Sequence, residues 1–380
     1  MSRVEISSDG KRYCAANLII RHATEADDEA LQIILAENPM QGWLRLAQQR
    51  SPSYFAGEDL MGHSIAIIGE DAAKDNAIIG MYHTSFLPLY INGQVVKTGY
   101  LGELRVNQSY RSSLRIIKHG FASIRSLTRA ESTTTQLWFT SIASDNHVAR
   151  RLLEADNPKL PRYTPRGELQ TLAISTHHGK RPTRFQPAIE NDIPTLCEFH
   201  QRQASQLNFA PCLDPSWLGG LSRQKGLTIE DFLIYKRDGR IEACIALWDQ
   251  RPFKQLVVQG YRSPLNYLRG LYNIFAYLST RPLLPGAHSI LESLYLSFFC
   301  CSKEFEEEAT ELVQEALYLA ARRGAKIGLI GVAAGNPLLA RLKKSFRPTI
   351  YKTCIESVSW RDEKPPELND APIQPEIALL

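Results

Sequence analysis

The sequence contains an internal repeat, and this repeat constrains the fold more than any other feature. Residues 185–196 align with residues 20–31. The matching positions are Ala188 with Ala23, Glu190 with Glu25, Asp192 with Asp27 and Leu196 with Leu31. A pattern that returns in this way indicates two copies of one structural unit. The chain of 380 residues is long enough for two packed cores.

Changes in composition divide the chain into five segments. We expect a polar leader over residues 1–16 and a flexible, proline-rich tail over residues 361–380. The first copy is expected to form a domain over residues 17–176. A polar linker over residues 177–183 is expected to lead to a second domain over residues 184–360.

Strand and helix patterns alternate in both copies. We therefore predict an α/β fold of the α+β kind, with two tandem domains that each have a mixed, mostly antiparallel sheet flanked by helices. A helix is expected over residues 42–49, and a hairpin over residues 89–96 because Asn92 and Gly93 favour a tight turn. The apolar, aromatic segment 264–277 is expected to be a buried helix. We expect the hairpin and this helix to form walls of the substrate cleft.

The bulk composition limits the functional classes. Hydrophobic residues are 44% and charged residues 22% of the chain, as in ordinary globular proteins. The net charge of +4 suits an anionic ligand but is too small to indicate a nucleic-acid-binding protein. No apolar run reaches the roughly 20 residues that span a membrane. Scattered cysteines without a CxxC pair indicate reduced thiols in a cytoplasmic protein. No metal site is expected, because His177 and His178 lack a matching set of ligands.

Residues 99–129 carry the clearest functional pattern. Apolar and polar side chains alternate over residues 101–106, which predicts a strand. After a polar turn, a helix with one apolar face is predicted from Leu114. The helix start combines basic and hydroxyl side chains: Arg111, Ser112, Ser113 and Arg115. A cationic helix start with free backbone N–H groups is suited to bind phosphate.

This succession of strand, polar turn, arginine and helix resembles the acetyl-CoA-binding core of the GCN5-related N-acetyltransferase (GNAT) superfamily. Leu104 and Val106 match the strand of the family pattern, and Arg111 matches the arginine or glutamine that opens its loop. The two glycines of the family's loop are replaced by Leu114 and Ile116. Glycines allow backbone amides to approach a diphosphate closely, so the loop departs from the pattern at its tightest point.

A second pattern of the superfamily is a helix capped by asparagine. Asn146 and Ala149 match it in the first copy, and the resemblance implies that Asn146 contacts the pantetheine arm of the cosubstrate. Capping of the helix alone explains Asn146 equally well. The tyrosine that many members use as general acid is absent, because Leu153 stands at its position. Tyr163 is the candidate substitute, and Asn336 begins a similar segment in the second copy.

The resemblance implies a tandem GNAT protein with its acyl-CoA site in the first copy. The residues expected to bind the cosubstrate are Leu104, Arg105, Val106, Arg111, Ser112, Ser113, Leu114, Arg115 and Asn146. In the second copy, the corresponding loop, residues 302–308, contains four glutamates. These carboxylates would repel a diphosphate. The second copy is therefore expected to be a structural domain.

The expected chemistry is attack of an amine on a thioester carbonyl, for which the amine must lose a proton. We expect Glu103 to act as the base, with Tyr100 nearby on the same strand and Tyr163 as the acid. An ion pair with a basic neighbour is an equally supported role for Glu103. Backbone N–H groups around Arg105 and Val106, where this strand separates from the next, are expected to polarise the thioester oxygen.

Three functions fit these observations. The first is an acyl-CoA-dependent N-acyltransferase, which most simply transfers acetyl from acetyl-CoA to the amine of a small molecule or peptide. The second is a tRNA-dependent aminoacyl-transferase of the tandem-GNAT kind, which the missing loop glycines suit. The third is an inactive GNAT pair that binds a ligand or partner. A homodimer is left open, and neither nucleic acid nor a membrane span is expected.

Overall fold

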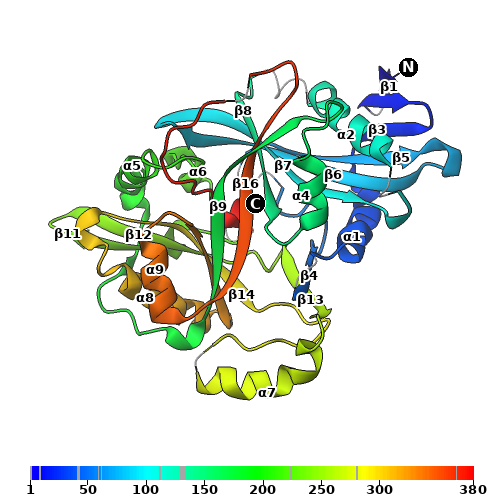
Figure 1. The fold of residues 1–380 in the computed structure, drawn as a ribbon. Coiled ribbons are helices and arrows are strands. Elements are labelled where there is room, and N and C mark those ends of the chain that lie inside the picture. Colours follow the sequence, from blue (N-terminus) through cyan, green and yellow to red (C-terminus); the bar gives the residue numbers. More distant parts are fainter. Residues whose placement is uncertain are drawn as a thin grey trace.

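The computed structural model describes most of the chain. The described residues are 2–7, 10–40, 43–58, 60, 62–110, 113–128, 134–222, 225–279, 281–364 and 366–380. Within these residues, the named strands form one sheet of 14 strands and one separate pair. Figure 1 shows that the large sheet runs through both halves of the molecule, with helices packed against each half.

The large sheet is mixed and mostly antiparallel. Its first strands in spatial order are β1 (Ser2–Ser7), β2 (Gly10–Ala15), β3 (Leu18–His22), β5 (Ser64–Asp71), β6 (Ala77–Ile91), β7 (Gln94–Val106) and β8 (Leu137–Ala143). The order continues with β16 (Thr349–Ser359), β9 (Arg162–Ser175), β15 (Ile327–Ala333), β14 (Ser293–Cys301), β12 (Arg240–Trp248), β11 (Phe232–Arg237) and β10 (Gln186–Pro187). Among the described strands, β7 with β8 and β14 with β15 are parallel neighbours. The predicted fold class is confirmed.

The two copies exchange their last strands. β9, which ends the first copy, lies between β15 and β16 of the second copy. β16, which ends the second copy, pairs with β8 of the first through Thr353–Val358. Each half of the sheet is therefore completed by a strand from the other copy. The expected boundary between residues 176 and 184 divides the sequence, but it does not divide the sheet.

A second, two-stranded sheet also joins the copies. β4 (Leu44–Gln49) pairs antiparallel with β13 (Gln255–Tyr261). The helix expected over residues 42–49 is therefore wrong for its described part. The reason is tertiary packing: Leu44 and Leu46 alternate with polar residues and pack beside Val258 and Tyr261.

The helices follow the repeat. The helices with described bounds are α1 (Asp28–Glu37), α2 (Leu114–Leu127), α4 (His147–Leu153), α5 (Ile193–Ala204), α6 (Pro215–Gly219), α7 (Leu265–Leu278), α8 (Ala309–Arg322) and α9 (Leu338–Phe346). Asp27 accepts a hydrogen bond from the Thr24 backbone at 2.8 Å, and Asp192 accepts one from the Ile189 backbone at 3.2 Å. The two aligned aspartates thus cap the same kind of turn before α1 and α5.

Both ends of the chain correct our expectations. The expected leader contains β1 and β2, which extend the large sheet beyond β3. The expected flexible tail carries Ile373, Ile377 and Ala378, whose side chains are buried. Tyr13 and Ala15 of β2 are buried as well, and composition alone does not reveal this packing. The expected linker is also packed, since the Lys180 backbone donates to Gln314 of α8 at 3.0 Å.

The α2 helix packs onto the first half of the sheet through a buried face. Ile117, Phe121 and Ile124 recur at helical spacing and join one core cluster with Ile20 and Trp138. This contact fixes α2 against the first half of the sheet. In the second half, α8 is buried against the sheet in the same way.

Candidate active site

The β7 strand is bulged where it separates from β8, while it stays paired with β6. Its parallel pairing with β8 extends only to Leu101, opposite Thr140. Beyond that point, Glu103 and Leu104 lie opposite the single residue Tyr82 of β6. Glu103 has a φ of 51°, in the left-handed region that side chains with a Cβ rarely adopt. A bulge at this point turns the strand, and β7 separates from β8 after Leu101, which is earlier than the expected position around Arg105 and Val106.

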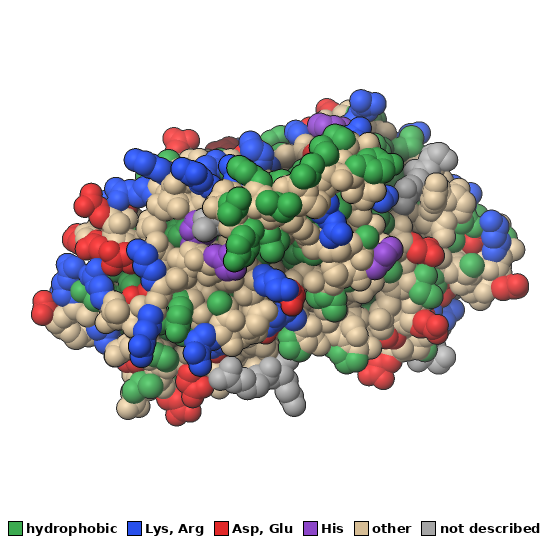
Figure 2. All heavy atoms as spheres, turned by 90° about the horizontal axis from the view of Figure 1, so that it is seen from below, with side chains coloured by type: hydrophobic (Ala, Val, Ile, Leu, Met, Phe, Trp, Pro, Cys, Tyr) green, Lys and Arg blue, Asp and Glu red, His purple; other side chains and the backbone are tan. Residues whose placement is uncertain are grey.

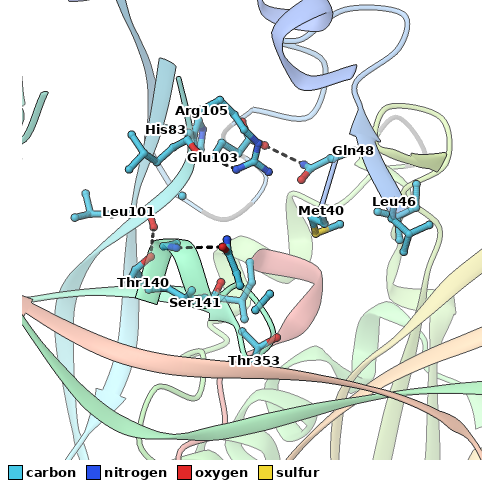
Figure 3. A pocket seen from close by; sticks show the side chains of 18 of the residues that line it. Met40, Leu46, Gln48, His83, Leu101, Glu103, Arg105, Thr140, Ser141 and Thr353 are labelled. Atoms are coloured by element: carbon cyan, nitrogen blue, oxygen red, sulfur yellow. Dashed lines mark hydrogen bonds between the residues drawn. The ribbon is translucent and has the colours of Figure 1, made fainter. Parts of the chain in front are cut away.

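A cavity of about 510 Å³ opens where β7 and β8 separate. The part lined by residues of the first copy, here called the first-copy lobe, has mainly apolar side chains: Ile20, Ile79, Leu101, Ile117, Phe121 and Ile124. Its second-copy lobe is lined by Leu256, Leu284, Leu291, Leu329 and Ile350. Figure 3 shows Glu103, Arg105 and His83 together on one side of the cavity, and Ser141 and Thr353 on another. The cavity is therefore built by both copies.

Glu103 is held by an ion pair and two neutral hydrogen bonds. Arg50 donates to its carboxylate at 2.8 Å, the Tyr54 hydroxyl donates at 2.7 Å, and Gln48 donates at 2.9 Å. Burial alone would raise the pKa of Glu103, but the charges of Arg50 and His83 and the hydrogen bonds outweigh it and lower the pKa to about 2. The carboxylate therefore stays ionised at neutral pH. The ion pair considered as an alternative role for Glu103 is present.

Lys254 enters the cavity wall from the start of β13. Its ammonium group donates a hydrogen bond to the Leu380 backbone oxygen at 3.1 Å. Burial lowers the pKa of Lys254 to about 8, and the nearby Arg50 charge adds to this effect, whereas Glu103 opposes it. A substantial fraction of Lys254 is thus neutral slightly above physiological pH.

The two predicted tyrosines occupy different places. Tyr100 is buried beside the point of separation, and its hydroxyl shares a hydrogen bond of 2.7 Å with Ser141. Burial raises the pKa of Tyr100 to about 12, so the hydroxyl stays protonated. Tyr163 lines the first-copy lobe and contacts Phe121 edge to face. Burial raises the pKa of Tyr163 as well, with the charge of Glu356 adding to it.

The predicted cosubstrate residues are only partly brought together. Leu104, Arg105 and Val106 line the cavity. The Nε atom of Arg105 is buried without a hydrogen-bond partner among the described residues, which leaves a donor for a ligand. Ser113 stands at the N-cap of α2 without a side-chain capping bond.

The rest of the expected phosphate site differs. Leu114 is exposed, and Arg115 donates to the Ala15 backbone at 3.1 Å, so its guanidinium is turned toward β2. Arg111 and Ser112 lie outside the described residues. Asn146 lines the cavity and caps α4, where its side chain accepts from the Ala149 backbone at 3.2 Å.

The equivalent opening in the second copy is filled by the end of the chain. β14 is bulged at Phe298, and the Phe298 backbone donates to the Glu376 carboxylate at 2.8 Å. Gln374 pairs with β15, where it accepts from the Ala333 backbone at 2.7 Å and donates to the Gly331 carbonyl at 2.9 Å. This explains why the open cavity belongs to the bulge of the first copy.

Sequence reasoning missed Arg50, Tyr54 and Lys254. Arg50 and Tyr54 flank a short polar segment, and Lys254 is a single charge at the start of an apolar strand. The signal that could have indicated Lys254 was a single basic residue next to residues predicted to be buried. Without the pairing of β4 with β13, nothing in the sequence places these side chains next to Glu103.

Comparison with solved structures identifies the fold. N-myristoyltransferase of Saccharomyces cerevisiae, solved with bound myristoyl-CoA, matches with a TM-score of 0.58 and 13% identity, over 95% of this chain and 87% of its own. A GCN5-related N-acetyltransferase from Sphaerobacter thermophilus matches with a TM-score of 0.55 and 12% identity, over 93% and 99%.

A third match is the GCN5-related glucosamine N-acetyltransferase region of a fungal multi-domain β-N-acetylglucosaminidase. Its TM-score is 0.58 at 14% identity, over 91% of this chain and 38% of that one. No protein-family model and no curated protein sequence matches the chain. The protein thus has the GNAT fold, and the predicted resemblance is confirmed at the level of fold.

The described residues contain neither a metal-binding cluster nor a membrane-spanning helix. No group of three or more histidine, cysteine, aspartate or glutamate side chains is placed to hold a metal ion. In the same part of the chain, no helix is long and apolar enough to cross a membrane.

Proposed function

We propose that the protein is an acyl-CoA-dependent N-acyltransferase and that its donor carries an acyl chain longer than acetyl. The observation that carries this proposal is the cavity at the point where β7 and β8 separate, beside the bulge at Glu103. Acetyl-CoA was the simplest donor expected from the sequence. An acetyl group, however, needs only a small part of about 510 Å³, a volume suited to a drug-sized ligand.

The first-copy lobe is suited to an acyl chain. Its wall is apolar, and it continues between the sheet and α2 as far as Phe121 and Ile124. Burial of each methylene group there contributes roughly 0.8 kcal/mol, so a long chain would gain affinity that acetyl does not. The bound myristoyl-CoA in the similar N-myristoyltransferase supports this assignment. In this proposal Tyr163 shapes the lobe and does not donate a proton.

The polar residues of the cavity divide the remaining tasks. Backbone N–H groups at Leu104 and Arg105 would polarise the thioester oxygen, and the Arg105 side chain would bind the anionic cosubstrate. Glu103, fixed by Arg50 and Tyr54, would attract the ammonium form of the amine. A carboxylate with a pKa of about 2 has little tendency to take the proton itself.

Proton removal is therefore assigned to another group. Lys254 in its neutral form would accept the proton from the amine, whose nitrogen then forms the C–N bond as the C–S bond breaks. The Tyr100 hydroxyl, which stays protonated, would donate a hydrogen bond to the thiolate leaving group, and the proton taken up by Lys254 would then pass to the thiolate to give the free thiol. The acceptor is a primary amine of a small molecule or peptide that reaches the cavity from the second-copy lobe.

Thermal unfolding with CoA, acetyl-CoA and myristoyl-CoA tests the proposal. A ligand at about 100 times its Kd stabilises a protein by roughly 2.7 kcal/mol, which raises Tm by roughly 5–10 °C. We expect the largest shift with myristoyl-CoA, and a smaller shift for Arg105→Ala. Lys118→Ala, which changes an exposed cation outside the cavity, is the matched control and should behave as the wild type.

The same experiment separates the alternatives. Equal shifts of Tm with CoA and with both acyl-CoAs would support a CoA-binding site and would contradict a donor with a long acyl chain. Indifference to every CoA ligand, together with a shift on addition of aminoacyl-tRNA, would favour the tRNA-dependent transferase. Binding without release of CoA thiol in the presence of an amine panel would favour an inactive pair.

A further inference from the structure

The α7 helix presents an apolar face to the outside of the molecule. Tyr267, Leu271, Ile274 and Leu278 recur at positions i, i+4, i+7 and i+11, so they share one side of the helix. Their exposed fractions are 82%, 68%, 63% and 77%. The sequence predicted that this helix would be buried, and the structure shows the opposite. An exposed apolar face of this extent marks an interaction site.

The orientation of α7 is fixed by its other side. Ala276 is buried, and Asn273 forms two hydrogen bonds with the Leu284 backbone, of 3.0 Å and 2.8 Å. Tyr272 packs onto the cluster formed by Val258 and Leu284. The polar contacts thus lie toward the protein and the apolar residues lie away from it. In Figure 1, α7 projects from the body of the molecule.

The segment around α7 carries only positive charge. Residues 251–290 contain no aspartate or glutamate, although the chain has 40 of them. Of its basic residues, Arg262, Arg269 and Arg281 lie on or beside α7, whereas Arg251 is paired with Asp249 and Lys254 lines the cavity. Arg262 is exposed just before the helix, and Arg281 follows it. Figure 2 shows the underside, where hydrophobic side chains gather and Lys and Arg side chains lie beside them.

The same segment leads from α7 into the cavity. Pro282, Leu283, Leu284 and Pro285 follow the helix and line the cavity wall, and Leu283 is also exposed. The apolar face of α7 and the apolar lining of the cavity are therefore joined by a short apolar loop. A ligand that lies against α7 is next to this side of the cavity.

We propose that α7 docks the protein onto an anionic lipid surface. The helix would lie flat at the level of the lipid headgroups, with Leu271, Ile274 and Leu278 inserted and Tyr267 near the boundary. Arg262 and Arg281 would contact the anionic headgroups at its two ends. This inference rests on the exposed face and its charge, and it does not depend on acyl transfer.

A second copy of the chain fits this face less well. Symmetric pairing of two α7 helices would bring the arginines of both segments together without an acidic residue between 251 and 290 to offset them. An anionic surface offers the opposite charge and an apolar layer at once. Charge complementarity thus favours the lipid surface.

Co-sedimentation with sucrose-loaded vesicles tests the proposal. We expect the full chain to bind vesicles of phosphatidylcholine with phosphatidylglycerol, and to bind phosphatidylcholine alone much less. The triple variant Leu271→Gln, Ile274→Gln, Leu278→Gln should lose at least about tenfold in affinity, because three inserted side chains become polar. Glutamine keeps a high helix propensity, so α7 should remain folded. Val148→Gln, at an equally exposed apolar residue of α4, is the matched control.

A second variant tests the contribution of the arginines to vesicle binding. Arg262→Glu with Arg281→Glu should weaken binding at low salt and abolish its dependence on phosphatidylglycerol. Absence of binding to anionic vesicles, or equal binding by the triple variant, would overturn the proposal. So would a wild-type dimer in light scattering that the triple variant dissociates, because α7 would then be a subunit interface. The thermal shift by acyl-CoA in vesicle-free buffer should be unchanged in the triple variant, which separates this test from that of the proposed function.

Discussion

Glu103 and Phe298 occupy the same position in the two bulged strands of the sheet. Each has a φ of 51°, and each begins a pair of residues that lies opposite one residue of the neighbouring strand. The backbone geometry is thus repeated, whereas the side chains have opposite roles. Glu103 faces an open cavity and pairs with Arg50, while Phe298 is buried against Trp248 and Phe232. Both copies thus have the bulge, but only the bulge of the first copy carries a charged side chain, Glu103.

The pairing of Arg50 with Glu103 should dominate the stability of the site. Glu103→Gln leaves the Arg50 charge buried without a partner, so we expect a loss of about 3–5 kcal/mol in the free energy of unfolding. Arg50→Met should cost a similar amount. The double variant should be less destabilised than the sum of the two, as urea titrations of all four proteins would show. Additive losses would mean that the two charges do not stabilise each other.

The same pair predicts a response to acid. The pKa of Glu103 is lowered from an ordinary value of 4.5 to about 2, so its stabilising contribution is complete above about pH 4.5. This contribution is lost as the pH falls from about 4.5 toward 2. In this range the carboxyl group of the unfolded state binds a proton and that of the folded state does not, so acid favours the unfolded state. Between these values the wild type should lose stability faster than Glu103→Gln does. Parallel curves from acid titrations followed by circular dichroism would contradict the assignment.

Gly120 should control the length of the acyl chain. It lies on α2 in the cavity wall, and a Cβ atom at this position would have no neighbouring side chain or strand atom within 4 Å. Gly120→Leu should fill the first-copy lobe and reduce binding of myristoyl-CoA by roughly tenfold or more, while acetyl-CoA is affected little. Gly120→Ala is the control, because it removes helix flexibility but adds one methyl group. Isothermal titration with both donors measures the ratio, and an unchanged ratio would show that the chain binds elsewhere.

Lys254 should set the pH dependence of the reaction. Because its pKa is lowered to about 8, the neutral form increases as the pH rises through 8, and kcat/KM should rise with it. Lys254→Met should remove this limb of the pH profile and lower the plateau by roughly 100-fold. For stability the sign is the same as in the Glu103 case, because both pKa values are lowered in the folded state. The folded state carries fewer protons than the unfolded state between pH 8 and 10.5, so wild-type stability should increase across this range and that of Lys254→Met should not.

The packing of the chain end against β15 gives a test without any ligand. A Cβ atom at Gly331 would clash with the Ile377 side chain, so Gly331→Ala should destabilise the protein by about 1–3 kcal/mol. Ile377→Ala should relieve the clash, and the double variant should be more stable than the sum of the single losses predicts. Gly335→Ala, which meets no atom within 4 Å, is the control. Equal losses for Gly331→Ala and Gly335→Ala in thermal unfolding would show that residue 377 does not pack there.

Local signals in the sequence predicted local structure well. The aligned Asp27 and Asp192 both cap the turns before their helices, because a capping signal extends over only three residues. Asn92 and Gly93 form the turn between β6 and β7, as a tight turn of this type requires residues that tolerate positive φ. The order of these elements was enough to predict the fold class.

The missed features depend on contacts between distant segments. The strand β4 contains good helix formers, and its pairing with β13, about 210 residues later, overrides that preference. The same pairing brings Arg50 and Lys254 to Glu103. Because the strand was not predicted, the polar network around Glu103 was not predicted either. The aromatic content of α7 indicated burial, but amphipathic periodicity shows only that one face is apolar, and not which way that face points.

The exchange of β9 and β16 also decides when the molecule can fold. The contact between β8 and β16 closes a loop of about 210 residues. The two strands that pair with β9, which are β15 and β16, are both synthesised after it. During synthesis on the ribosome, the first copy must therefore wait with open sheet edges until residue 359 has emerged. A chain cut within residues 177–183 would give two fragments, each lacking the strand that closes its sheet. Such fragments should be prone to aggregate when they are made separately and should recover when they are made together.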